Sequence, residues 1–91
     1  MIAKEIIFEG RVQGVGFRYT VKDLARGFDV CGTVQNLPDG SVKLYLIGEA
    51  TEVDQMIHEI MGESNVAHHI RNSIVRDAAI DHSCQRFSII R

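Results

Sequence analysis

The chain has 91 residues, of which 45% are hydrophobic and 24% are charged, and its formal net charge at pH 7 is −2. This length suits one domain with one modest core, so we expect residues 1–91 to form a single domain. The weak negative charge argues against nucleic acid and anionic membranes as partners. No apolar run has the length of a membrane span.

The N-terminal residues lack the long apolar stretch of a signal peptide, which predicts a cytoplasmic protein. The two cysteines, Cys31 and Cys84, are then most simply free thiols, although one disulfide is the alternative. We expect a monomer.

The first predicted element is a strand at Lys4–Val12, in which Ile6, Phe8 and Val12 share one parity. A helix is predicted after the glycines that follow. Its apolar face carries Val21, Leu24, Ala25 and Phe28, at the spacing i, i+3, i+4 and i+7.

The segment between these two elements, Gly10–Arg18, reads G-R-V-Q-G-V-G-F-R and is called here the glycine-rich segment. Glycines allow a tight turn in which backbone N–H groups converge, and a helix that starts there adds the positive end of its dipole. Arg18 adds a planar set of donors that suits a phosphate or a carboxylate. The segment therefore indicates a site for a small oxyanion, or else only a tight turn with a surface arginine.

A second strand is predicted at Val30–Asn36, and Asn36 shares the parity of its apolar residues. An inward amide at a strand end is either a hydrogen-bonded core group or a functional one. Leu37–Gly40 has proline second and glycine fourth, which predicts a type I turn and a hairpin with the next strand. In that strand Val42, Leu44 and Leu46 form the inner face.

Thr51 and Asp54 resemble a capping box at the start of a second helix. Its predicted core face carries Val53, Met56, Ile57, Ile60 and Met61, and Gly62 is a plausible stop. Two short strands are predicted at Ile70–Asp77 and Arg86–Ile90.

The predicted order is β-α-β-β-α-β with an extra C-terminal strand. It indicates an α+β protein of the ferredoxin-like type, with two helices on one face of a largely antiparallel sheet of four to five strands. This fold hosts many functions, so function has to be argued from the site.

Other chemistry-bearing residues form no recognisable pattern. The four histidines have no zinc-like spacing with each other or with the cysteines; they are His58, His68, His69 and His82. We therefore expect no metal and no cofactor. Two tyrosines, Tyr19 and Tyr45, are too few for an RNA-stacking surface, which makes an RNA-binding module the weakest alternative.

The glycine-rich segment resembles the G-R-V-Q-G-V-x-F-R signature of the acylphosphatase family. Residues 32–40, G-T-V-Q-N-L-P-D-G, resemble the second signature of that family, G-x-V-x-N…D-G, at the expected spacing. The stretch Gly62–Ile70 departs from the pattern, because it lacks the proline that family members usually carry there.

The resemblance implies an enzyme that hydrolyses the carboxyl–phosphate bond of small acyl phosphates and releases inorganic phosphate. It implies that Arg18 grips the phosphate and that Asn36 orients the attacking water. It also implies phosphate contacts from the backbone of the residues that lead to the arginine, namely Gln13, Gly14, Val15, Gly16 and Phe17.

The alternative is a non-catalytic ferredoxin-like module that binds phosphate or carbamoyl phosphate for a partner, as in larger proteins such as a hydrogenase maturation factor. Because the sequence ends with the domain, we expect the free-standing enzyme.

Overall fold

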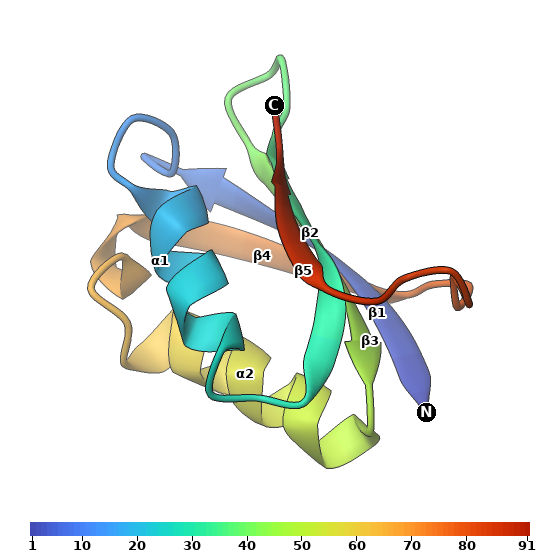
Figure 1. Ribbon diagram of the computed structural model, residues 1–91. Coiled ribbons are helices and arrows are strands. Elements are labelled where there is room, and N and C mark those ends of the chain that lie inside the picture. Colours follow the sequence, from blue (N-terminus) through green and yellow to red (C-terminus); the bar gives the residue numbers. More distant parts are fainter.

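The computed structural model describes residues 1–91 (Figure 1) and has the predicted order of elements. The elements are β1 (Ile2–Gly10), α1 (Phe17–Ala25), β2 (Val30–Asn36), β3 (Val42–Gly48), α2 (Ala50–Gly62), a short 3₁₀ helix (Ala67–His69), β4 (Ile70–Asp77) and β5 (Phe87–Ile90).

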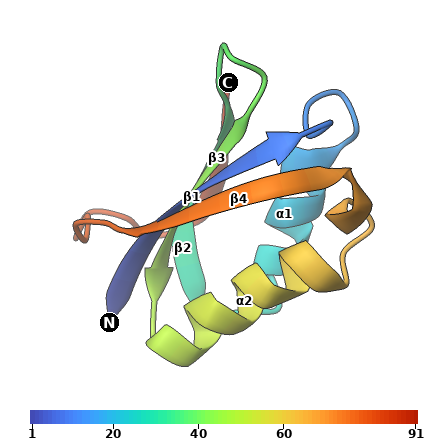
Figure 2. The same ribbon diagram turned by 180° about the vertical axis from the view of Figure 1, so that it is seen from behind.

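The five strands form one sheet in the order β4-β1-β3-β2-β5. All neighbours are antiparallel except β2 and β5, which are parallel. Both helices cover the same face of this sheet, as Figures 1 and 2 show from opposite sides. The ferredoxin-like α+β architecture is thus confirmed. Neither helix is long and apolar enough to cross a lipid bilayer.

The core lies between the sheet and the helices. The even-numbered residues of the central strands supply most of the sheet side: Ile6, Phe8, Val34, Val42, Leu44 and Leu46, all fully buried. The helices add Phe17, Val21, Val53, Met56 and Ile60. The rings of Phe8 and Phe17 lie 5.2 Å apart, so the first residue of α1 packs onto β1 beside the end of that strand. This contact fixes the start of α1, which carries Arg18.

The first strand ends at Gly10, two residues before the predicted end at Val12. Gly10 has φ = 130°, and a Cβ atom there would lie 2.3 Å from the carbonyl oxygen of His69. The Arg11 N–H donates to this same oxygen at 3.0 Å, so the chain leaves the regular ladder at this point. Val12 is nevertheless fully buried, as its parity predicted.

Two predictions about the second helix are wrong. Thr51 and Asp54 form no capping box, because α2 begins at Ala50 and Glu49 is its N-cap, without a side-chain hydrogen bond. Met61 is 40% exposed rather than part of the core. A helix turns by about 100° per residue, so Met61 lies well to one side of the buried line that ends at Ile60.

Candidate active site

The turn between β1 and α1 depends on two glycines in the left-handed region. Gly14 has φ = 77° and Gly16 has φ = 80°. A Cβ atom at either position would meet no heavy atom within 4 Å, so glycine is favoured here by the backbone conformation and not by crowding. Gly16 is also the N-cap of α1, which places the helix start directly against the turn.

The backbone N–H groups of this turn are unpaired within the main chain. None of residues 13–19 donates a hydrogen bond to a backbone carbonyl. The first turn of α1 contains no acidic residue, and no side chain caps its N-terminus. Unpaired N–H groups and the positive end of a helix dipole together favour a bound anion. The oxyanion site at this turn stays a prediction, which these two features support.

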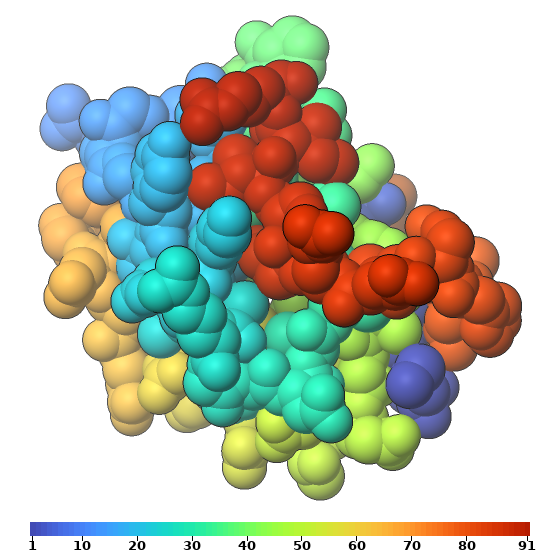
Figure 3. Space-filling view, in the orientation of Figure 1, coloured from blue at the N-terminus to red at the C-terminus, as the bar shows by residue number.

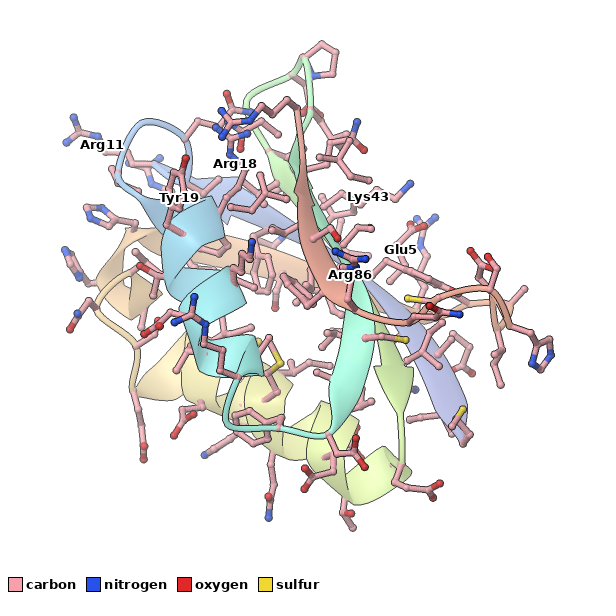
Figure 4. The ribbon with its side chains drawn as sticks, viewed as in Figure 1. Glu5, Arg11, Arg18, Tyr19, Lys43 and Arg86 are labelled. Atoms are coloured by element: carbon pink, nitrogen blue, oxygen red, sulfur yellow. The ribbon has the colours of Figure 1, made fainter.

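Arg18 extends from the first turn of α1 and carries an unpaired charge. Its side chain is half-buried and has no carboxylate within 4.0 Å. Figure 4 shows Arg18 and Tyr19 leaving the same turn of the helix, whereas Arg11 projects away from them. The Arg18 guanidinium is therefore free to contact an anion held by the turn.

Asn36 is the last residue of β2 and is half-buried. Its Oδ1 atom is buried and has no hydrogen-bond partner. A buried polar oxygen without a hydrogen-bond partner destabilises the folded state. Stability of the fold therefore does not explain why Asn36 occupies this position. Asn36 Oδ1 is therefore not part of a hydrogen-bonded core network, and a functional role for this amide stays a prediction.

Arg18 and Asn36 line one small pocket of about 110 Å³. Its other lining residues are Val12, Gly14, Gly16, Phe17 and Tyr19. Of the remaining predicted site residues, neither Gln13 nor Val15 lines it, and Val15 instead packs against the hydrophobic core. The sequence analysis did not name Tyr19 as a site residue. Its position next to Arg18, in the first turn of the predicted helix, could have indicated that it lines the pocket.

Gln13 has a supporting position that the sequence did not indicate. Its Nε2 atom donates to the carbonyl oxygens of Leu37 at 2.8 Å and Ser41 at 2.9 Å. Within this hairpin the Asp39 carboxylate accepts bonds from the N–H and the hydroxyl of Ser41, which lower the pKa of Asp39. The glycine-rich segment is thus tied to the turn that follows Asn36.

The other chemistry-bearing residues lie elsewhere. His58 is exposed on α2, and no group of three or more His, Cys, Asp or Glu side chains is arranged to hold a metal ion. Cys31 and Cys84 are free thiols in a separate hollow of about 420 Å³ at the opposite end of β2 from Asn36. Burial, and then the neighbouring Cys84 thiol, raise the pKa of Cys31 to about 11.

A model of the family described as acylphosphatase matches residues 4–89. The chain belongs to the acylphosphatase family. An acylphosphatase from Archaeoglobus fulgidus is 41% identical over 81 residues, which cover 89% of this chain and 90% of that relative. An acylphosphatase from Lactobacillus gasseri is 36% identical over 81 residues, again covering 89% of each chain.

Solved structures of the family have the same fold. The crystal structure of acylphosphatase from Bacillus subtilis matches this structure with a TM-score of 0.87 at 30% sequence identity. The match covers 100% of both chains. Full-length HypF, in a phosphate- and nucleotide-bound form, matches with a TM-score of 0.86 at 28% identity. That match covers 99% of this chain but 12% of HypF, so the domain also occurs within larger proteins.

Proposed function

We propose that this chain hydrolyses acyl phosphates, with Arg18 binding the phosphate and Asn36 orienting the attacking water. The observation that carries the proposal is the shared pocket. It brings the free Arg18 guanidinium and the partnerless Asn36 Oδ1 together at a helix N-terminus with unpaired N–H groups. Family membership supports the reaction class.

In the proposed complex, backbone N–H groups and one side chain both bind the negatively charged phosphate. The N–H groups of residues 13–18 donate to the phosphoryl oxygens, and the Arg18 guanidinium adds a charge-assisted pair of hydrogen bonds. These donors are held in place before the substrate arrives, which is the main contribution that a protein makes to phosphoryl transfer.

In the proposed step a water oxygen forms a bond to phosphorus as the bond between phosphorus and the acyl oxygen breaks. The leaving group takes the electron pair as a carboxylate, and the water proton passes to phosphate and solvent. A carboxylic acid with a pKa of roughly 4.3 leaves as an anion at neutral pH and needs no general acid. The Asn36 side-chain amide lines the pocket and holds the water through its carbonyl oxygen or its N–H group, which fixes the position of the water.

The proposed setting is a cytoplasmic monomer that uses no metal. Both cysteines are free thiols, which suits a reducing compartment.

The test is hydrolysis of acetyl phosphate by the purified chain, with phosphate release measured in buffer and in excess chelator. We expect equal rates in the two conditions. A phosphate monoester should be a poor substrate, because an alkoxide leaves badly without an acid to protonate it. Activity that disappears with chelator and returns with a divalent ion would overturn the metal-free scheme. Phosphate binding without any turnover would favour the non-catalytic binding module.

A further inference from the structure

The rim of the candidate site carries a second arginine that neither sequence signature contains. Tyr19 lines the pocket with Arg18 and Asn36, and its side chain reaches outward, being 59% exposed. The Arg91 guanidinium donates a hydrogen bond of 3.0 Å to the Tyr19 hydroxyl. Arg91 therefore lies one side chain away from the pocket.

The parallel pairing of β5 with β2 explains this position. Gln35 of β2 is opposite Ile90 of β5, so Arg91 follows beside Asn36, the last residue of β2. In Figure 3 the red atoms of the C-terminal segment meet the blue atoms of the segment between β1 and α1. The strand at the edge of the sheet thus carries a cation to the rim of the site.

Three cationic side chains influence Tyr19. The hydrogen bond from Arg91 and then its charge lower the pKa of Tyr19, and the charges of Arg18 and Lys22 act in the same direction. None of these three cations has a carboxylate within 4.0 Å. Although the chain is negative overall, the side chains at this rim gather positive charge that no side-chain carboxylate pairs with.

The size of the pocket decides which part of a substrate meets this rim. At about 110 Å³ it is far smaller than the several hundred Å³ of pockets that enclose a whole organic ligand. With the phosphate held by the glycine-rich segment, the acyl chain lies outside this pocket, where the exposed Tyr19 forms part of the rim.

We propose that Arg91 and Tyr19 bind a second anionic group on the acyl chain, so that the site prefers acyl phosphates that carry a further carboxylate. This inference rests on the proposed function and adds the acyl end of the substrate to it. The guanidinium of Arg91 pairs with the carboxylate, and the Tyr19 hydroxyl donates to it once the substrate replaces the present contact.

The experiment compares kcat/KM for succinyl phosphate, which carries a carboxylate, with kcat/KM for acetyl phosphate, which does not. Wild type is expected to favour succinyl phosphate. Arg91→Gln should lower this preference by roughly fivefold, the scale of one exposed ion pair, mainly through KM. Arg91→Lys should retain part of it, and Tyr19→Phe should reduce it. Arg11→Gln, which removes a charge that points away from the site, should leave the ratio as in wild type.

Four outcomes would overturn the inference. A wild-type ratio near one, or an unchanged ratio in Arg91→Gln, would remove the acyl-side site but not the enzyme. Equal losses on both substrates together with a lower Tm would mean that Arg91 only holds β5 against α1. If wild type hydrolyses neither substrate, the proposed function fails and the inference with it. Spectrophotometric titration of the tyrosines provides a separate check, since loss of the Arg91 charge should raise the pKa of Tyr19.

Discussion

The side-chain amide of Gln13 donates a hydrogen bond of 2.8 Å to the carbonyl oxygen of Leu37, the residue directly after Asn36. A second bond of 2.9 Å reaches the Ser41 carbonyl across the same hairpin. The glycine-rich segment and the strand end that carries Asn36 therefore hold one another in position. In the proposed mechanism this brace sets the distance between the bound phosphate and the oriented water.

We predict that Gln13→Ala lowers both stability and activity. The variant loses two side-chain hydrogen bonds, which should cost about 1–2 kcal/mol in the free energy of unfolding, while the Leu37 and Ser41 carbonyls keep their backbone donors. A loosened water position should lower kcat roughly tenfold with acetyl phosphate, measured on protein shown to be folded. Gln35→Ala is the matched control, because Gln35 belongs to β2 but faces away from the helices. If both variants behave alike, Gln13 is not a brace for the site.

Arg18 should not be replaceable by lysine. An ammonium keeps the charge but loses the planar pair of donors, so Arg18→Lys should lose about 3 kcal/mol of transition-state stabilisation, roughly a hundredfold in kcat/KM. Arg18→Ala should also abolish competitive inhibition by inorganic phosphate. Arg11→Lys controls for the change of side chain at an exposed arginine of the same segment. Near-normal activity of Arg18→Lys would contradict the proposed binding mode.

The Cys31 thiol should react slowly with alkylating reagents. With a pKa of about 11 in place of 9.0, its thiolate fraction near pH 8 is about a hundredfold lower than that of an ordinary thiol. Cys84→Ala should bring this pKa down, because the Cys84 thiol is its second-largest cause after burial. Iodoacetamide labelling across a pH series, read by mass spectrometry for each cysteine, measures both effects. A midpoint for Cys31 near 9 in wild type would refute them.

The same shift has a consequence for stability at high pH. The folded protein holds the Cys31 proton more tightly than the unfolded chain, so the contribution of this group decreases as the pH rises from 9.0 to about 11. Cys31→Ser should show a weaker loss of stability across this range than wild type. An equal loss in both proteins, followed by urea unfolding, would show that other groups account for it.

The sequence predicted what depends on local pattern. Alternation placed Phe8 and Leu44 in the core, and glycine spacing placed Arg18 at the start of a helix behind an open turn. The capping box at Thr51 was wrong because the connection after β3 is so short that α2 starts at Ala50. The preference of single residues for helix ends is weak, and the length of the connection between two elements can override it.

Features of the site that depend on pairing between distant segments could not be predicted. The two backbone carbonyls that accept hydrogen bonds from the Gln13 side chain lie 24 and 28 residues further along the chain. The residues of the contact between Arg91 and Tyr19 are 72 positions apart in the sequence. That contact exists because β5 pairs in parallel with β2 at the edge of the sheet, and no local pattern encodes this register. The inward parity of Asn36 was predictable, but the absence of a partner for its Oδ1 needed the packed structure.

The central claim is that Asn36 acts on water and not on the fold, and the variant Asn36→Ala tests it most directly. We expect kcat for acetyl phosphate to fall by roughly a hundredfold or more, the scale of a misplaced catalytic group. The Tm should change little, because the buried Oδ1 makes no hydrogen bond that the substitution would remove. Inorganic phosphate should still bind as a competitive inhibitor through Arg18 and the glycine-rich segment. Wild-type kcat in folded Asn36→Ala, or a loss of activity explained by unfolding alone, would contradict the account.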